Sequence, residues 1–565
     1  MGSMKNLLRL LDKPQRARLG WFTLLSLASP VTDLLGVSVM IPILQRAFSQ
    51  RASAEIIEQL ILLAALLLLT GAFELLKNRA SVALVTDISH SWSVKIYELY
   101  SMEELEDHNR KTAAEAINAA RNDPAVCAGV ILSCIGLAVD TLTTTAYALA
   151  IIYVARGVGV VSCGMLAILM AGLYYYSRVC VARYGEKRRQ LEIRAGGLVS
   201  TMFGAYREIK VDARRENLIK RYRKASADCA QVQRDYAFTQ GLQSIILRDA
   251  MQSALFLFLA AVLAYGLELS FILPDILIFI TLLTRILPLC IRIVKTLTEL
   301  RFADKYFEAV QTSLERYAVL ARAREDMARV REKRVTLNEG IRIENLSFHY
   351  PNGCQIFEDA SIHIPAGCST AIIGASGVGK TTLLDLLLGL LRPQAGHIWY
   401  DDFDLVEGRD AQGPCRADIG AVVSYIPQII YLNDETVRGN VTFMASADSE
   451  DEKRIIECLR CAQIWEDVQK MPDGLDTIIG RNGVAISGGQ RQRVALARAL
   501  YKQAEILIMD EATAALDMDT ERAVIDSIRQ TRGQKTILMV THRLSLANEC
   551  EHIYKLENRR LIKVR

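Results

Sequence analysis

Six long apolar runs in the first 300 residues constrain the fold of this chain more than any other feature of its sequence. An α-helix needs roughly 20 residues to cross the hydrocarbon core of a bilayer, and each run is near or above that length. Six such runs are difficult to explain as buried helices of a water-soluble protein. We therefore predict a helical membrane domain with six transmembrane helices over residues 1–321. The runs cover residues 20–48, 56–76, 125–155, 157–177, 250–267 and 272–294.

The charges between the runs indicate how the helices cross the membrane. The N-terminal segment is basic, and residues 178–248 contain sixteen Lys and Arg residues. By the positive-inside rule, the N-terminus and the loops at 77–124 and 178–248 are cytoplasmic, and so are both ends of the chain. These loops are long and helix-prone. We expect membrane helices that continue into the cytoplasm, with tips near 104–111 and 204–211 that contact a soluble domain.

Composition favours a chain that is partly embedded in a membrane and partly exposed to water. Of its 565 residues, 51% are hydrophobic and 23% are charged, too apolar for one soluble globule and too charged for a wholly intramembrane protein. The formal net charge of +4 gives no case for nucleic acid as a partner. Cys458 and Cys461 form a C-x-x-C with no second pair nearby. We expect them to be buried apolar residues rather than a metal or redox site.

The sequence pattern changes after residue 321. The charged stretch at 322–335 is predicted to form a linker helix. From residue 341, short β-branched strands alternate with Gly and Asn turns and amphipathic helices. This alternation is typical of an α/β nucleotide-binding domain, which we predict over residues 336–565.

The first chemical motif is GASGVGKT at residues 374–381, between an apolar strand and an apolar helix. That context is the one in which a Gly-rich loop binds phosphate, because its backbone N–H groups and the helix N-terminus all face the anion. We expect the Lys380 side chain to reach the β and γ phosphates and the Thr381 hydroxyl to bind Mg²⁺. The residues assigned to ATP here are Gly374, Ser376, Gly377, Gly379, Lys380, Thr381 and Thr382.

The second motif is ILIMDEAT at residues 506–513, an apolar strand that ends in two carboxylates. Asp510 is placed to hold Mg²⁺ directly or through water, and Glu511 to polarise a water that attacks the γ phosphate. A further apolar strand, TILMVTH, ends at His542, which can hydrogen-bond the γ phosphate. A pair of solvated acids at a strand end would not explain why these three features accompany one another.

The third motif is SGGQ at residues 487–490, followed by the helix-forming run QRQRVALARAL. A hydroxyl and bare backbone N–H groups at a helix start make a second anion site. Two γ-phosphate sites in one domain are redundant unless they serve different nucleotides. We therefore predict a head-to-tail dimer with ATP between the Gly-rich loop of one copy and this helix of the other. The residues assigned to ATP are Ser487, Gly488, Gly489 and Gln490.

In combination these motifs resemble the ATP-binding-cassette (ABC) transporters, specifically exporter-type half-transporters, over essentially the whole chain. The resemblance implies six membrane helices with long cytoplasmic extensions, then an α/β P-loop ATPase domain with a β-rich and a helical subdomain. It also implies ATP and Mg²⁺ as cofactors, ATP hydrolysis coupled to transport, and a homodimer in a bacterial inner membrane with its ATPase domains cytoplasmic. A heterodimer with a partner whose own site is degenerate remains an alternative.

The same resemblance implies roles for individual residues. Tyr350 corresponds to the aromatic residue that stacks on adenine, and Asp517 to the acid that communicates across the dimer. Gln428 corresponds to the residue that links the Mg²⁺ and γ-phosphate site to the membrane domain, and Glu511 to the catalytic base. Arg481 departs from the family pattern, because many exporters of this type have Glu there. This difference puts the usual contact between that loop and the membrane domain in question, not ATP binding.

Ionisable residues inside the apolar runs indicate where a substrate could bind, because such residues usually face a cavity or one another. Arg285 and Arg292 are seven residues apart, hence on one face of the last helix. Together with Arg248 they suit a phosphate or pyrophosphate group. The alternative is that these arginines form internal ion pairs or extend towards the cytoplasm. The candidate partners are Asp33, Glu74 and Asp140.

Two segments resemble bacterial flippases for lipid-linked oligosaccharides, namely R-x-x-P-x-x-x-R in the last run and DLLGVSVMIPIL in the first. The resemblance implies ATP-driven movement of an anionic amphiphile from the inner to the outer leaflet, most plausibly a lipid-linked oligosaccharide, with membrane lipid as a partner. The segment at 45–59 departs from that subfamily, because it is too short for a substantial external helix. Alternatives are an exporter of peptides, lipids or drugs, and an ATP-gated channel or regulator.

Overall fold

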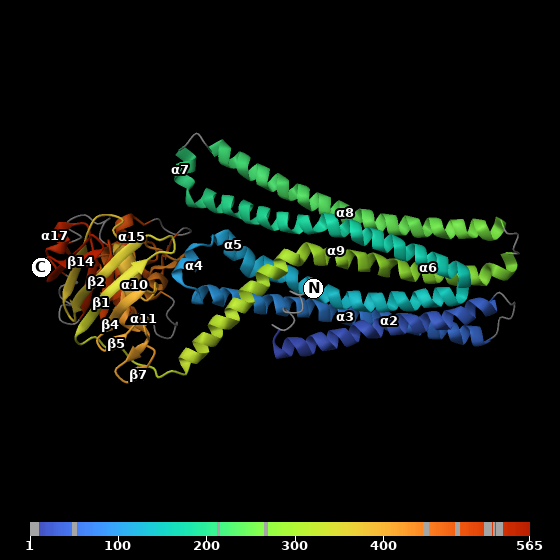
Figure 1. Cartoon of the computed structure of the whole chain (residues 1–565), viewed down its shortest axis with the longest axis horizontal. Helices are drawn as coiled ribbons and strands as arrows, with labels where there is room; N and C mark the ends of the chain where they lie inside the picture. Colours follow the sequence, from blue (N-terminus) through green and yellow to red (C-terminus); the bar gives the residue numbers. More distant parts are fainter. Residues whose placement is uncertain are drawn as a thin grey trace. The chain divides into compact units, whose positions relative to one another are not determined.

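The computed structural model separates into two compact units, one of helices and one that mixes helices and strands (Figure 1). The first contains Met1–Glu103 and Asp107–Ala321, and the second contains 104–106 and Arg322–Arg565. The structure describes residues 11–47, 54–211, 215–264, 269–443, 451–480, 486–512, 522–523, 526 and 535–565.

The helical unit is built from long helices joined by short ones. At about 1.5 Å per residue, the longer helices exceed the thickness of a bilayer, which agrees with apolar runs that continue into polar extensions. The long helices are α2 (Lys13–Ala47), α3 (Ala54–Met102), α6 (Asp123–Gly204), α8 (Arg215–Ala264) and α9 (Leu269–Ala328). The short ones are α4 (Leu105–Asn109), α5 (Ala113–Ile117), the π-helical turn η1 (Asn118–Asn122) and α7 (Tyr206–Val211).

Helix α6 contains both the third and the fourth apolar runs, and it doubles back on itself. Arg189 and Asp123 form an ion pair with 2.9 Å between Nη2 and Oδ2. A straight helix would place these residues, 66 positions apart, about 99 Å from each other. The Sγ atom of Cys163 also lies 3.8 Å from the carbonyl oxygen of Ala148. The chain therefore reverses between residues 148 and 163, and the two runs are antiparallel.

Four helices of the described chain are long and apolar enough to cross a membrane. They fall on the first, second, third and sixth predicted runs, and a shorter apolar helix, Cys163–Tyr176, falls on the fourth. Most side chains of the fifth run lie outside the described residues, so the number of six spans stays a prediction. The four are Lys13–Met40, Ile56–Met102, Ala113–Tyr153 and Leu277–Ala328.

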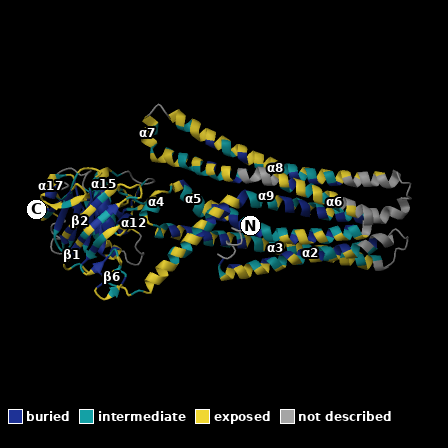
Figure 2. Cartoon of the chain, in the orientation of Figure 1, coloured by how far each residue is buried: buried dark blue, intermediate teal, exposed yellow. Residues whose placement is uncertain are grey.

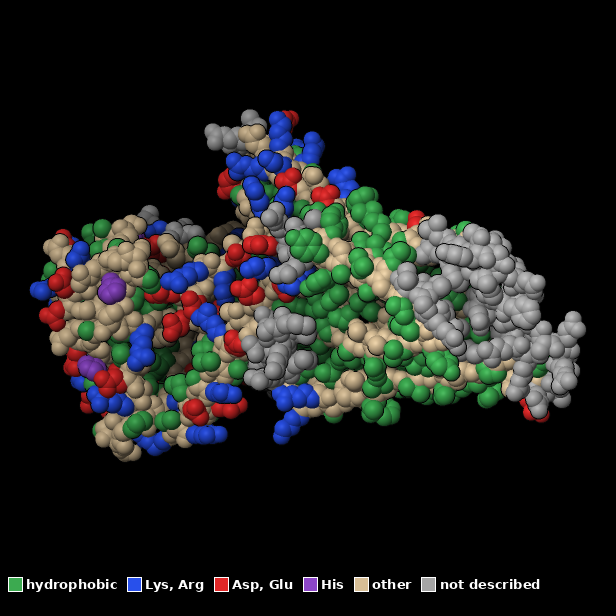
Figure 3. All heavy atoms as spheres, turned by 45° about the vertical axis from the view of Figure 1, so that its right-hand side comes forward, with side chains coloured by type: hydrophobic (Ala, Val, Ile, Leu, Met, Phe, Trp, Pro, Cys, Tyr) green, Lys and Arg blue, Asp and Glu red, His purple; other side chains and the backbone are tan. Residues whose placement is uncertain are grey.

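The surface of α3 has the apolar character expected of a lipid-facing helix. Ile61, Leu68 and Leu75 are exposed and recur every seven residues, so they lie on one side of the helix. Hydrophobic side chains also cover much of the helical unit in the space-filling view (Figure 3). Further along α3, Trp92 is fully buried in a core that includes Tyr306 of α9. The first part of α3 thus exposes apolar side chains that can contact lipid. Its later part buries apolar side chains against other helices of the unit.

The second unit is built on two six-stranded sheets. One is antiparallel, with the order β2 (Gln355–Pro365), β1 (Gly340–His349), β4 (Ala395–Tyr400), β5 (Phe403–Asp404), β6 (Arg409–Asp410) and β7 (Gly413–Pro414). The other is mostly parallel, with the order β14 (Arg560–Lys563), β13 (His552–Glu557), β3 (Ser369–Ile373), β12 (Thr536–Val540), β11 (Ile506–Asp510) and β8 (Val423–Ile426). The helices are α10 (Lys380–Leu387), α11 (Ile419–Val422), α12 (Val437–Thr442), α13 (Glu452–Cys461), α14 (Trp465–Gln469), α15 (Gly488–Tyr501) and α17 (Leu544–Ala547). Short segments β9 (Glu435–Thr436), β10 (Ile478–Ile479) and η3 (Gly474–Asp476) complete it.

The parallel strands form the centre of this unit and bring the motifs together. Strands β11 and β12 are buried along their whole length, which explains their continuous apolar sequences. Buried residues are concentrated in the interior of this unit (Figure 2). Asp510 pairs in register with Val540, and Val540 with Ile372. Because these strands are parallel and in register, the residues that follow them meet at one edge of the sheet.

The predicted linker helix over 322–335 is wrong in its extent. Helix α9 continues to Ala328 and then ends. The backbone beyond it pairs with the second unit, where Lys333 N donates to Arg416 O at 2.8 Å. Arg331 and Lys333 also form ion pairs with Asp410, at 2.5 and 3.3 Å. The pKa of Asp410 is lowered to about 2, and the hydrogen bond from Arg331 is the main cause. These contacts favour extended backbone over another helical turn.

The two cysteines of the C-x-x-C lie in different environments. Cys458 is buried in the core around α13, whereas Cys461 is exposed. Cys458 is therefore the buried apolar residue that the sequence predicts, and Cys461 is not.

Candidate ATP site and membrane cavity

The Gly-rich loop between β3 and α10 needs glycine at two positions. Gly377 and Gly379 have φ angles of 77° and 113°, in the left-handed region that other residues avoid. A Cβ atom on Gly379 would also lie 2.3 Å from Cγ2 of Ile356. The loop conformation and its close packing therefore depend on these glycines.

Lys380 is buried at the start of α10 and folds back over this loop. Its Nζ atom donates to the carbonyl oxygens of Gly374 at 3.0 Å and Ala375 at 2.8 Å. It also lies 3.1 Å from Nε2 of His542. Burial lowers the pKa of Lys380, because a desolvated ammonium is costly. A phosphate group beside Nζ would supply the negative charge that the two carbonyl oxygens lack.

Hard oxygen donors for a divalent cation lie next to this lysine. Thr381 Oγ1 donates to Oδ2 of Asp510 at 3.1 Å, and Asp510 is almost fully buried. Burial is the main cause that raises the pKa of Asp510. A hydroxyl and a buried carboxylate fit Mg²⁺, which prefers oxygen ligands and would offset the burial of the anion. Asp385, a residue that sequence reasoning missed, is near enough to be influenced by Asp510, and mainly burial raises its pKa to about 6.

The three predicted catalytic side chains converge after β8, β11 and β12. Glu511 accepts a hydrogen bond from Gln428 Nε2 at 2.8 Å through one oxygen. Its other oxygen lies 2.6 Å from Nε2 of His542. Glu511 has a φ angle of 49°, unusual for a non-glycine residue, and its N–H donates to Val540 O at 3.0 Å. Sparsely populated backbone conformations of this kind cluster at functional sites. Both carboxylate oxygens are therefore held in place.

Tyr350 lies beside the same loop. Its hydroxyl is 3.1 Å from Oγ1 of Thr382, and its ring meets Phe348 edge-on at 5.0 Å between centroids. This contact places the tyrosine next to α10. Stacking on adenine stays a prediction.

The SGGQ motif forms the start of α15. Ser487 is the N-cap: its Oγ accepts from Gln490 N at 3.1 Å, and its N–H donates to Gln490 Oε1 at 2.9 Å. Gly488 and Gly489 open the helix, where backbone N–H groups have no intrahelical acceptor. Within the described parts of the chain, no hydrogen bond joins residues 487–490 to residues 374–382. Asp517 and Arg481 lie outside the described residues.

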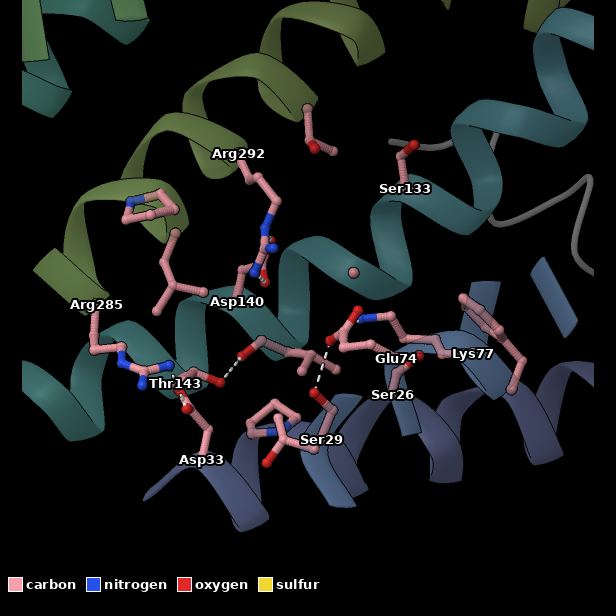
Figure 4. Close-up of a pocket in the computed structure, with 18 of the residues that line it drawn as sticks. Ser26, Ser29, Asp33, Glu74, Lys77, Ser133, Asp140, Thr143, Arg285 and Arg292 are labelled. Carbon is pink, nitrogen blue, oxygen red and sulfur yellow. Dashed lines mark hydrogen bonds and ion pairs between the residues drawn. The ribbon is translucent and has the colours of Figure 1, made fainter. Parts of the chain in front are cut away.

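A polar cavity of about 660 Å³ opens in the helical unit (Figure 4). Residues of α2, α3, α6 and α9 line it. Arg285 and Arg292 both face it from α9, as their seven-residue spacing predicts. Lys77 and several hydroxyls also line it and were missed by sequence reasoning, although Ser26, Ser29 and Asp33 recur at helical spacing in the first run. Lys77 was missed because it lies one residue past the end of the second predicted run.

Both cavity arginines are ion-paired. Arg285 Nη1 lies 2.7 Å from Asp33 Oδ1, and Arg292 makes two hydrogen bonds to Asp140, at 2.8 and 3.0 Å. The structure thus has the internal pairing that the sequence left open as an alternative. Arg248 pairs with the adjacent Asp249 at 2.9 Å and is not among the described residues that line the cavity. The geometry therefore does not bring Arg248 together with the other two arginines.

This fold and site define a class of protein in which a helical membrane domain is joined to a P-loop nucleotide-binding domain. Residues 357–514 match the family model of the ABC transporter. The chain thus contains an ABC transporter ATPase domain. Over its whole length it is similar to the structure of a bacterial Atm1-family ABC exporter with ATP bound, with a TM-score of 0.72 and 22% identity, covering 97% of this chain and 95% of that one. The fold is that of an Atm1-family ABC exporter.

Relatives with curated names match over part of the chain. The ATP-dependent lipid A-core flippase of Ralstonia nicotianae is 37% identical over 225 residues, 40% of this chain and 37% of the flippase. The mitochondrial iron-sulfur clusters transporter ATM1 of Saccharomyces cerevisiae is 36% identical over 270 residues, 46% of this chain and 38% of ATM1. The matched segments thus span under two fifths of these relatives.

Proposed function

We propose that the chain is one half of an ATP-driven exporter that moves an amphiphile from the inner to the outer leaflet of a bacterial inner membrane. The observation that carries the proposal is the convergence of Lys380, Asp510 and Glu511 at one sheet edge of a chain whose helices are long and apolar enough to cross a membrane. Relatives named as a lipid A-core flippase and as a transporter support export. By the positive-inside rule, both termini and the ATPase domain are cytoplasmic.

The site residues divide the work of hydrolysis. Lys380 binds the β and γ phosphates, and Thr381 and Asp510 would hold Mg²⁺, which neutralises charge on the phosphates when it is bound. Glu511 accepts the proton of the attacking water. Gln428 and His542 orient its two carboxylate oxygens, at 2.8 and 2.6 Å. This arrangement favours turnover and weighs against an ATP-gated channel or regulator, because a gate needs binding more than hydrolysis.

We expect two copies of the chain to form a homodimer with two composite ATP sites. The support is that the helix start at 487–490 is built to receive an anion, yet makes no hydrogen bond to residues 374–382 within the described chain. Each Gly-rich loop would then face the SGGQ helix of the second copy. A heterodimer with a degenerate partner remains the alternative, and the complete motif set of this chain favours the homodimer.

The substrate proposal rests on the membrane cavity. Arg285 and Arg292 on one face of α9 support a phosphate-bearing head group, and a lipid-linked oligosaccharide is one such amphiphile. The carboxylate partners Asp33 and Asp140 favour the second candidate, an exporter of other lipids, peptides or drugs. Both candidates use the same ATP site, so only the substrate that the cavity binds can distinguish one candidate from the other.

Flipping in proteoliposomes tests the proposal. With a fluorescent lipid-linked oligosaccharide as the probe, the first candidate predicts ATP-dependent outward movement by the wild type and none by Glu511→Gln. The Arg292→Ala variant should hydrolyse ATP without moving the probe, because it keeps both the ATP site and the Asp33–Arg285 pair. If the wild type hydrolyses ATP but does not move the probe, while another lipid, peptide or drug is moved, the second candidate is correct. Hydrolysis with no ATP-dependent movement of any amphiphile would contradict export.

A further inference from the structure

From the charges that line the membrane cavity, we infer that the exported amphiphile is a lipid whose head group is zwitterionic, with one ammonium and one phosphate. The inference rests on the proposed export function and narrows it to the second candidate, a lipid other than a lipid-linked oligosaccharide, because it names the class of head group that the cavity admits.

The charged groups of the cavity balance. Among the described residues that line it, three side chains are acidic and three are basic. Each is hydrogen-bonded to an opposite charge of the same set, so the lining has no net formal charge (Figure 4). The pairs are Glu74 with Lys77, Asp33 with Arg285, and Asp140 with Arg292.

This balance decides which head groups can bind. An anionic head group that drew Arg292 away would leave the carboxylate of Asp140, only 14% exposed, without its counter-charge. Removing one partner of a shielded ion pair is strongly unfavourable. A cationic head group would strand the arginine in the same way. A zwitterion avoids both costs, because its phosphate pairs with the arginine while its ammonium pairs with the aspartate.

The pairs differ in how freely they can exchange partners. Both carboxylate oxygens of Asp33 accept a hydrogen bond, one from Arg285 at 2.7 Å and the other from the buried hydroxyl of Tyr147 at 2.5 Å. These bonds join α2, α6 and α9, which makes this pair a structural tie. The Arg292 side chain is 54% exposed and bonds Asp140 alone among the contacts described for it. The Asp140–Arg292 pair is therefore the one that a head group can enter.

An unsatisfied hydroxyl gives independent support for a ligand. Ser26 lines the cavity and is only 3% exposed, yet its Oγ atom has no hydrogen-bond partner in the described structure. Buried polar atoms normally have partners, so each exception requires an explanation. A phosphate or ester oxygen of the substrate would accept the bond that Ser26 can donate.

One of the helices that line the cavity also has an exposed apolar side, which favours a lipid over a soluble zwitterion. Ile61, Leu68 and Leu75 are exposed along one side of α3, and Glu74 and Lys77 of the same helix line the cavity. The acyl chains of a lipid could thus stay in the bilayer that this side of α3 faces. A soluble zwitterion would gain nothing from that surface.

ATPase stimulation by defined head groups tests the inference. The full chain in maltoside micelles would receive short-chain lipids with identical acyl chains and either a phosphoethanolamine or a phosphoglycerol head group. We expect the zwitterionic lipid to stimulate the wild type about fivefold more than the anionic lipid. Asp140→Asn leaves Arg292 unpaired and should reverse the preference. Asp140→Glu, which keeps the carboxylate, should retain it and shows that position 140 tolerates substitution.

A matched control removes a carboxylate outside the cavity. Asp249→Asn breaks the Arg248 ion pair and should keep the wild-type preference. Equal or greater stimulation by the anionic lipid in the wild type would overturn the inference, as would an Asp140→Asn variant with an unchanged preference. Stimulation by soluble phosphoethanolamine equal to that by the lipid would overturn the assignment to a lipid. Hydrolysis that no zwitterion stimulates overturns this inference alone, whereas a wild type without any ATP hydrolysis overturns the proposed function as well.

Discussion

Replacing Glu511 with Gln is expected to lower the rate of ATP hydrolysis by about 10²–10⁴-fold while ATP still binds. The amide has the shape of the carboxylate but cannot accept a proton from water. Glu511 is the side chain whose two oxygens Gln428 and His542 hold at 2.8 and 2.6 Å, so the protein fixes the orientation of this acceptor. The variant should therefore bind ATP and release phosphate very slowly.

Steady-state phosphate release at saturating ATP, together with equilibrium ATP binding, measures the two parts of this expectation. Glu557→Gln is the matched control, because Glu557 pairs with Lys555 on the surface of β13. This variant should hydrolyse ATP at the wild-type rate. A Glu511→Gln rate within tenfold of the wild type would mean that another group accepts the proton.

Replacing Lys380 with Ala should weaken ATP binding by about 10²-fold, the effect of losing two charge-assisted hydrogen bonds to phosphate. The Lys380 ammonium is buried with only carbonyl oxygens and His542 as hydrogen-bond partners among the described residues. Because burial already disfavours the charge, its removal should leave the unfolding temperature without nucleotide nearly unchanged. The rise in unfolding temperature on adding ATP should disappear.

Calorimetric ATP titration and thermal unfolding with and without ATP measure both effects. Lys555→Ala, which removes a surface lysine paired with Glu557, serves as the control and should retain the full ATP response. If Lys380→Ala instead unfolded at a much lower temperature without nucleotide, the lysine would be a structural residue rather than the phosphate ligand.

The convergence of Lys380, Asp510 and Glu511 could be predicted from sequence because it is encoded locally. A Gly-rich turn after a buried strand, and polar residues directly after two other buried strands, must meet when those strands are parallel and in register. The contacts of Lys380, Asp510 and Glu511 follow from this arrangement. The orientation of individual groups could not be predicted from sequence. An example is the Ser487 hydroxyl, which caps its own helix.

The membrane cavity was less predictable because its pairing is between distant residues. Spacing on α9 correctly places Arg285 and Arg292 on one face, but no local pattern specifies that Arg285 meets Asp33, 252 positions away. The end of α9 at Ala328 likewise depends on Asp410, which binds Arg331 from the distant strand β6. Long-range ion pairs therefore decide both the chemistry of the cavity and the boundary of the last membrane helix.

Mixing two inactive variants tests most directly whether two copies of this chain build the ATP sites of an exporter. Lys380→Ala disables the Gly-rich loop. Gly488→Asp places a carboxylate at the start of α15, the proposed anion site, where it would repel phosphate but suits the helix. Each variant alone should hydrolyse almost no ATP. Co-expressed, they should regain up to about a quarter of wild-type hydrolysis, because half of randomly paired dimers hold one intact composite site of two. No recovery in the mixture would contradict a site shared between two copies.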